Sequence, residues 1–141
     1  MTAATFTTDD VRNRMKNTPI FETMQYSLEH IAAGQATLRA PYRRALDGIF
    51  NSFHGGLLMT LADTAACVAV LSQAGPDAVV TTTDMNIRFL APCLSDAVAK
   101  ARVIKFGSTL CPVAIDLEDA SGKAVAIAQV TYMRLQKIPS R

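Results

Sequence analysis

The sequence predicts an α+β fold in which a curved antiparallel sheet of about five to six strands wraps one long apolar helix. Apolar side chains surround residues 57–71 on almost every face, and such a helix must be covered by protein on most sides. After Gly75-Pro76 the pattern changes to alternating apolar and polar residues, which is typical of half-buried strands. Strands joined by short turns pair antiparallel, so these segments predict one sheet around the helix.

The first 40 residues predict a short helix followed by a hairpin. Residues 8–17 have a helical pattern, with Thr7 or Thr8 as N-cap, acids in the first turn and Asn17-Thr18-Pro19 at the end. Gly34 lies in the middle of a loosely alternating segment, which predicts strands over 24–32 and 35–40. We expect residues 1–19 to form a peripheral element of a single domain that spans residues 1–141.

Four further strands are predicted after the long helix, over residues 79–91, 97–106, about 113–118 and 124–135. Pro92 ends the first of them, and Gly107-Ser108 and residues 119–123 supply turns between the others. We expect successive strands to be neighbours in the sheet. One sheet covers only part of the helix, so a second subunit is expected to cover more, with the sheets paired edge to edge or face to face.

The composition excludes several classes of function. The net charge is +2 and the basic residues are scattered apart from Arg39, Arg43 and Arg44, which is far from the pattern of a nucleic-acid-binding protein. Three widely spaced cysteines among apolar neighbours indicate buried thiols of a reducing compartment and no zinc site. The longest unbroken apolar run, residues 65–71, is too short to span a bilayer. We therefore expect a cytoplasmic protein that binds no metal, nucleic acid or membrane.

One segment, HGGLLMTLADTAAC at residues 54–67, carries the chemistry. Gly55 and Gly56 lack side chains and begin the predicted helix, where unpaired N–H groups and the helix dipole favour an anion. Asp63 lies two turns inside the helix and shares a face with Thr60 and Cys67. A buried carboxylate costs several kcal/mol without compensation, so Asp63 is expected to be exposed or to take part in a reaction.

The same segment, together with TTTDMNIRFLAP at residues 81–92, resembles the hotdog-fold acyl-CoA thioesterases, specifically the PaaI-like group of phenylacetate degradation within the 4-hydroxybenzoyl-CoA thioesterase superfamily. The resemblance covers roughly residues 20–136. It implies the hotdog fold and the hydrolysis of an aryl or medium-chain acyl-CoA to free acid and coenzyme A without a metal or redox cofactor. It also implies a homodimer or a dimer of dimers (a homotetramer), because each active site of this group lies between two subunits.

The resemblance also implies roles for individual residues. The backbone N–H of Gly55 would bind the thioester oxygen, beside His54, and Asp63 would act as nucleophile or as general base on water. The hydroxyl of Thr82 would help to hold the attacking water from across the dimer. This interpretation places Asp63 opposite the amides that begin its own helix, in a pocket that the neighbouring subunit completes. Six further residues are predicted to bind substrate: Asn51, Gly56, Thr60, Thr64, Asn86 and Arg88.

The chain departs from the group at Gly48, because the group commonly has Asn or Gln six residues before the motif histidine. Asn51 could substitute for that amide from a shifted loop. The missing amide leaves both the rate and the orientation of the substrate open.

Each of the site residues also has a structural interpretation. His54 can cap the helix, and Gly55-Gly56 can form only a tight turn. Asp63 can be a buried carboxylate paired with an arginine, and Thr82 suits any half-exposed strand. The basic residues Arg39, Arg43, Arg44 and Arg88 can bind the phosphates of coenzyme A or lie on a solvated surface.

Two other functions compete with thioester hydrolysis. A non-catalytic acyl-CoA-binding or regulatory protein on the same fold is favoured if the loop around Gly48 has lost activity, and it would bind tightly without turnover. An enoyl-CoA hydratase would need an Asp and a His together before the helix, which this sequence lacks. We find no serine-hydrolase elbow, phosphate loop or dinucleotide fingerprint.

Overall fold

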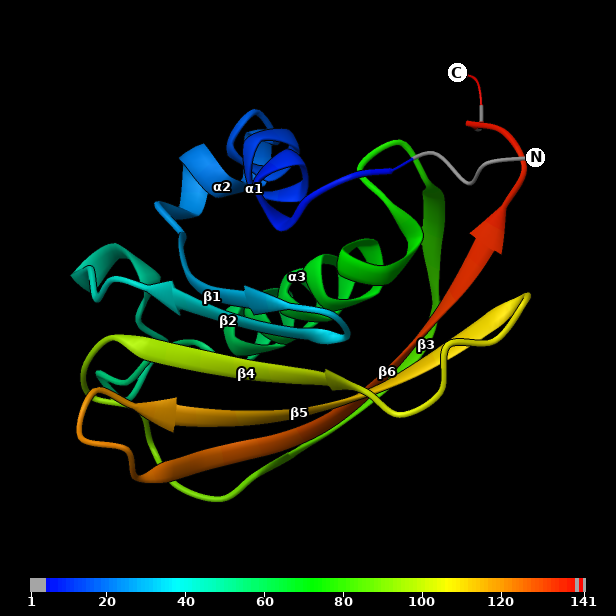
Figure 1. The fold of residues 1–141 in the computed structure, drawn as a ribbon. Coiled ribbons are helices and arrows are strands. Elements are labelled where there is room, and N and C mark those ends of the chain that lie inside the picture. The colour runs from blue at the N-terminus through cyan, green and yellow to red at the C-terminus, as the bar shows by residue number, and fades with distance from the viewer. Residues whose placement is uncertain (1–4, 139, 141) are drawn as a thin grey trace.

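The computed structural model describes residues 5–138 and 140 and confirms the α+β architecture (Figure 1). One long helix lies against the concave face of a six-stranded antiparallel sheet, and two short N-terminal helices cover the other side of that helix. Residues 1–4, which belong to the predicted N-terminal element, lie outside the described residues. The elements are α1 (Thr8–Lys16), α2 (Pro19–Met24), β1 (Ser27–Ala32), β2 (Gln35–Ala40), the 3₁₀ turn η1 (Arg44–Leu46), α3 (Gly55–Ala74), β3 (Val79–Phe89), β4 (Ala97–Val103), β5 (Leu110–Asp119) and β6 (Ala124–Leu135).

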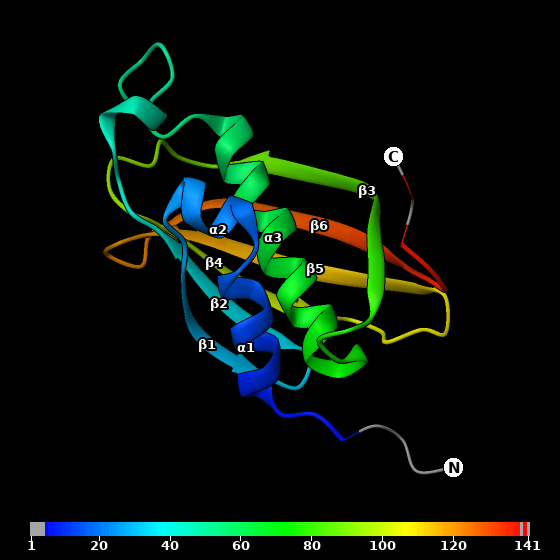
Figure 2. The ribbon, with the colours of Figure 1, turned by 90° about the horizontal axis from the view of Figure 1, so that it is seen from above.

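The strand order is β1-β2-β4-β5-β6-β3, with every neighbouring pair antiparallel. The prediction that successive strands are neighbours is correct for the last three strands and wrong for β3 and β4. Because β4 pairs with β2 on one side and β5 on the other, β3 pairs with β6 and forms an edge of the sheet. Strand β3 bends sharply (Figure 2), and its pairing with β6 contains a bulge between Thr82 and Asp84.

Helix α3 is the core of the molecule. Sheet residues pack against it from β2, β4, β5 and β6, and most of its residues from Leu58 to Ser72 are buried. A stripe of Gly56, Thr60, Asp63 and Cys67, spaced three or four residues apart, stays partly or fully exposed. Among the described residues α3 alone has the length and mean hydropathy of a membrane-spanning helix, and 56% of its most apolar window is buried, as expected for a core helix.

The N-terminal helix forms as predicted, and a second helix follows it. Thr7 caps α1 with a reciprocal capping box to Asp10, and the buried face of α1 consists of Val11 and Met15. The expectation that residues 24–26 begin the hairpin is wrong, because Pro19 begins helix α2 and Gln25 ends it in the left-handed region. Proline ends one helix and also suits the first position of the next.

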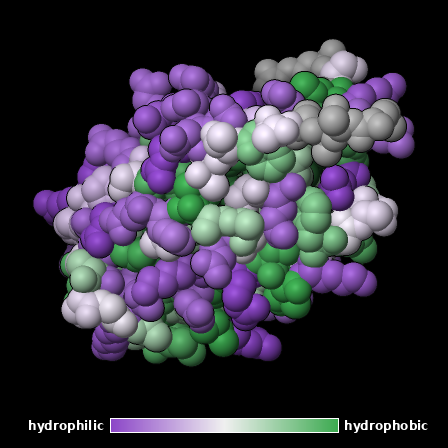
Figure 3. Space-filling view, viewed as in Figure 1, coloured by the Kyte–Doolittle hydropathy of each residue, from purple (hydrophilic) through white to green (hydrophobic). Residues whose placement is uncertain are grey.

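The exposed large apolar side chains are unevenly placed. On the face in Figure 3, hydrophobic patches are small and separated by hydrophilic residues. The loop before α3 and the end of β3 approach each other, because the N–H of Phe53 donates to the carbonyl of Cys93 at 2.9 Å. These two segments carry five exposed apolar side chains, which we call the apolar rim: Ile49, Phe50, Phe89, Leu90 and Leu94.

Candidate active site

The start of α3 carries one free backbone donor. His54 is the N-cap, and its Nδ1 accepts the N–H of Gly56 at 2.9 Å. The N–H of Gly55 makes no hydrogen bond to any described residue. First-turn N–H groups point outward beyond the helix end, where the dipole favours negative charge. The Gly55 amide is therefore available to an anionic oxygen, and the capping interpretation of His54 is confirmed.

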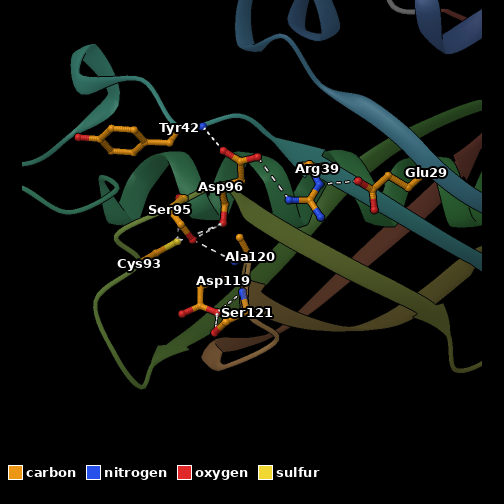
Figure 4. Close-up of polar contacts among 9 residues, drawn as sticks. All are labelled: Glu29, Arg39, Tyr42, Cys93, Ser95, Asp96, Asp119, Ala120 and Ser121. Atoms are coloured by element: carbon orange, nitrogen blue, oxygen red, sulfur yellow. Dashed lines mark hydrogen bonds and ion pairs between the residues drawn. The ribbon is translucent and has the colours of Figure 1, made fainter.

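A polar cluster holds the segments around this helix start (Figure 4). Asp96 accepts the backbone N–H of Tyr42 at 2.7 Å and the Arg39 guanidinium at 3.3 Å. Arg39 also pairs with Glu29, and that hydrogen bond is the main reason that the pKa of Arg39 lies above its usual value. Arg39 is thus occupied by two carboxylates.

The same cluster fixes the segment between β3 and β4. The Cys93 thiol donates to the carbonyls of Ser95 and Asp96, and Ser95 Oγ accepts the N–H of Ala120 (Figure 4). Burial raises the pKa of the Cys93 thiol. Because the carbonyl of Cys93 accepts the N–H of Phe53, just before the N-cap, these contacts also position the Gly55 amide.

Asp63 is held through one of its two carboxylate oxygens. Its Oδ1 accepts the hydroxyl of Thr82 on β3 at 2.7 Å. The Tyr132 hydroxyl on β6 lies 2.9 Å from the same Oδ1 and 2.9 Å from the Asp63 carbonyl oxygen. No described residue donates a hydrogen bond to Oδ2. Oδ2 is also not among the buried polar atoms that lack a partner. Asp63 therefore has a fixed orientation and one oxygen free for chemistry, and it is not paired with an arginine.

Two groups beside Asp63 stay protonated at neutral pH. Burial raises the pKa of the Tyr132 phenol far above its usual range, and the Cys67 thiol and the Asp63 carboxylate act in the same direction. Burial, and then the charge of Asp63, raise the pKa of Cys67 to about 11. Tyr132 is thus a hydrogen-bond donor, and Cys67 is a neutral thiol rather than a nucleophile.

Sequence reasoning missed Tyr132. The alternation of β6 places Val130 and Tyr132 on the buried face, and both are buried. That pattern was visible, but the pairing of β6 with β3, which brings Tyr132 opposite Thr82, was not. A buried tyrosine whose hydroxyl needs a partner is the signal that could have identified it.

The predicted roles of the polar residues are corrected in two places. Thr82 donates to Asp63 of its own chain, so its expected contribution from across a dimer is not what the structure contains. Asn86 and Arg88 are exposed and alternate with Met85 and Ile87, which pack on the core. Asn86 and Arg88 therefore lie on the opposite face of the sheet from Asp63, and one chain does not bring them into the site.

The helix threonines and the loop residues contribute less directly. The Thr60 hydroxyl donates to the Gly56 carbonyl at 3.0 Å, and Thr64 donates to the Thr60 carbonyl at 2.7 Å. Asn51 is exposed, with a positive φ of 56°, and its side chain bonds to no described residue. A Cβ on Gly48 would meet His54 Cδ2 at 3.8 Å, which is ordinary contact, so the position has room for a side chain.

Gly55 and Asp63 of one chain cannot act on the same carbonyl. They are eight positions apart on α3, or about 12 Å along the axis. An oxygen bound to the Gly55 N–H lies further away still, because that N–H points beyond the helix start. Since reacting atoms approach to about 3–3.5 Å, the expectation that Asp63 faces the amides of its own helix is wrong.

The described residues include no group of three or more histidine, cysteine or acidic side chains placed to hold a metal ion. All three cysteines are free, as predicted, with Cys93 and Cys111 buried and Cys67 half-buried.

Comparisons with known proteins show the family and the fold of the chain. Residues 50–126 match the model of the Thioesterase superfamily. The chain is 30% identical over 132 residues to human acyl-coenzyme A thioesterase 13, covering 89% of this chain and 93% of the human protein. A thioesterase family protein from Silicibacter pomeroyi superposes with a TM-score of 0.83 at 27% identity, covering 90% of this chain and 96% of that one. The E. coli PaaI protein from the phenylacetic acid degradation operon shares the fold, with a TM-score of 0.84, 22% identity and coverage of 94% and 95%.

Proposed function

The chain belongs to the thioesterase superfamily and is a thioester hydrolase, and we propose that its substrate is an acyl-coenzyme A, which it hydrolyses to free acid and coenzyme A. The human relative is named for that reaction and aligns over most of both chains. The observation that carries the mechanism is the carboxylate of Asp63, which is fixed through Oδ1 and free at Oδ2. The hydrolysis as proposed needs no metal or redox cofactor.

Asp63 supplies the attack on the thioester. Its free Oδ2 either takes a proton from an attacking water or attacks the carbonyl carbon itself. Both routes require that the carboxylate keeps one orientation, which Thr82 and Tyr132 provide through Oδ1. The Tyr132 phenol stays protonated, so it continues to donate through the reaction.

Gly55 supplies the binding of the oxyanion. As the thioester carbonyl becomes tetrahedral, its oxygen gains negative charge, and the free N–H at the start of α3 stabilises that charge. The absence of a side chain on Gly55 allows close approach, although the ring of Phe89 already lies over it. One such donor is typically worth about 2.7–4 kcal/mol in the transition state.

Because the two groups are too far apart in one chain, we propose a homodimer in which Gly55 of the partner subunit meets Asp63 of this one. A twofold axis that runs two α3 helices antiparallel places the start of one helix beside the middle of the other. The edge strand β3, with 11 residues, has backbone groups free to pair with the same strand of a second copy. The apolar rim lies at the start of α3 and the end of β3, where such an interface would cover it.

The experiment measures thiol release from a panel of acyl-CoA esters by wild-type protein and Asp63→Asn. We expect Asp63→Asn to fold and to lose about 10²–10⁴-fold in kcat, the usual contribution of a positioned base. Asp84→Asn is the matched control, because Asp84 is an exposed carboxylate of β3 that has no hydrogen bond to Asp63. Full activity of Asp63→Asn would refute the mechanism.

A further inference from the structure

A cavity of about 370 Å³ lies between α1, the C-terminal half of α3 and the start of β3. Its volume is within the range of about 300–1,000 Å³ that small-molecule sites occupy. Apolar side chains form most of its wall: Met15, Leu71, Pro76, Ala78, Val79, Val80 and Ile138, together with the thiol of Cys67. Nothing in the reaction described above uses this cavity.

The cavity begins one helical turn from the reacting carboxylate. Cys67 follows Asp63 by four positions on the exposed stripe of α3, so their Cβ atoms are about 5–6 Å apart. Val80 precedes Thr82 by two positions, so both side chains lie on the same face of β3. The charge of Asp63 also raises the pKa of Cys67, after the larger effect of burial. The acyl chain of a thioester whose carbonyl lies beside Asp63 therefore enters this cavity when the chain points toward the C-terminal end of α3.

The chemistry of the wall suits an apolar group. The polar members of the lining are Thr18 and one pair of opposite charges, Arg14 and Asp77, so the cavity offers no net charge to an anion. The Cys67 thiol is neutral. A larger neighbouring cavity of about 780 Å³ shares Arg14 and Asp77 but adds Asp10, Asn13 and Asn17, which makes it a poorer site for a hydrocarbon.

We propose that this cavity binds the acyl group of the substrate, and that α1 thereby sets which acyl groups are accepted. The proposal rests on the proposed function, because it places the thioester carbonyl beside Asp63. An acetyl group is too short to reach Cys67, whereas an apolar acyl group longer by one helical turn or more fills the space. Cys67 at the entrance and Met15 on α1 are the residues that determine specificity.

The test is the ratio of kcat/KM for decanoyl-CoA to that for acetyl-CoA. Cys67→Phe places a ring in the entrance, and we expect the ratio to fall at least tenfold, since a hydrophobic pocket discriminates by about 10–200-fold per methylene-sized change. Met15→Ala enlarges the cavity on the side of α1. We expect this variant to raise the ratio of kcat/KM for acyl chains longer than decanoyl to kcat/KM for acetyl-CoA. Ile127→Phe is the control, because Ile127 is an exposed residue of β6 and the substitution places a phenyl ring outside the cavity.

A binding measurement separates this proposal from the proposed function. A non-hydrolysable thioether analogue of decanoyl-CoA is titrated into each variant beside coenzyme A itself. One outcome is that the wild type releases no thiol but binds the analogue more tightly than coenzyme A, and that Cys67→Phe abolishes this difference in affinity. That outcome would contradict the proposed hydrolysis and support the acyl site. If folded Cys67→Phe and Met15→Ala keep the wild-type ratio and the wild-type binding preference, the acyl site is wrong whether or not the protein hydrolyses thioesters.

Discussion

At the scale of single residues, the two carboxylate oxygens of Asp63 differ in their contacts. One oxygen fixes the side chain through Thr82 and Tyr132, and the other is free. A carboxylate with both oxygens bound would be well placed but unable to react, and one with neither bound would lack a fixed direction. The two hydroxyls thus act as positioning groups, and their contribution can be measured separately from that of the carboxylate.

Tyr132→Phe tests this positioning role. The change removes a donor to a charged acceptor, an interaction worth about 1.5–3 kcal/mol. We expect a lower free energy of unfolding, and a fall in kcat larger than the change in KM, because the phenol bonds to the Asp63 carboxylate that we propose to act in the chemical step. Urea denaturation and steady-state kinetics measure the two effects. Tyr42→Phe is the control, since the Tyr42 hydroxyl bonds to Asp47 instead, and equal kinetics in both variants would contradict the role.

Gly48→Asn tests the departure from the related group. The backbone there needs no glycine, and the nearest atoms to a built Cβ are at 3.8 Å or more. We expect the variant to keep its melting temperature within a few degrees and to raise kcat, because the amide returns to the position that the group commonly uses. A lower kcat in a folded variant would show that Asn51 already fills this role.

At the scale of elements, the groups with strongly raised pKa values gather around helix α3. Burial raises the pKa values of Tyr26, Cys67 and Tyr132, all of which lie near Asp63. A buried acid with a raised pKa keeps its proton in the native state at a pH where the unfolded chain has lost it. The helix–sheet contact therefore depends on pH on the alkaline side.

This dependence predicts weaker folding at alkaline pH. The unfolded groups ionise near pH 9 for cysteine and pH 10 for tyrosine, whereas native Cys67 ionises at about 11. Above pH 9 the unfolded state binds fewer protons than the native state, so the free energy of unfolding falls as the pH rises. Urea denaturation between pH 8 and 10.5 measures the slope, and Tyr132→Phe should make it shallower. A free energy of unfolding that is constant over this pH range would contradict the raised pKa values of these groups.

The sequence was informative about elements and much less so about their neighbours. Periodicity located α3 and all six strands, because alternation and all-round hydrophobicity are local signals. The pairing of β3 with β6 is not a local property of the sequence. It follows from the pairing of β4 with β2, which leaves β3 to pair elsewhere. The same limitation hid Tyr132 and gave Thr82 the wrong partner chain, whereas Gly55 and Asp63 could be found because both belong to one helix.

At the scale of the whole molecule, the mechanism that we propose needs two groups that lie too far apart in one chain to form one complete site. The free amide lies at the start of α3, and the free carboxylate lies about two turns further along. An exposed edge strand and the apolar rim give a second copy a surface to bind. Assembly is therefore part of the catalytic mechanism that we propose.

The most direct test of the account is complementation between two inactive variants. Asp63→Asn lacks the carboxylate, and Gly55→Pro lacks the amide, while proline suits the first helical position and His54 has the extended backbone that a following proline needs. A Cβ at position 55 would meet the exposed ring of Phe89 at 3.0 Å. When the two variants are mixed and allowed to exchange subunits, each heterodimer gains one site with both groups intact. We expect the mixture to recover about a quarter of wild-type kcat, as random pairing into twofold dimers gives. A mixture as inactive as its components, with heterodimers present, would show that the site does not combine Gly55 of one chain with Asp63 of the other.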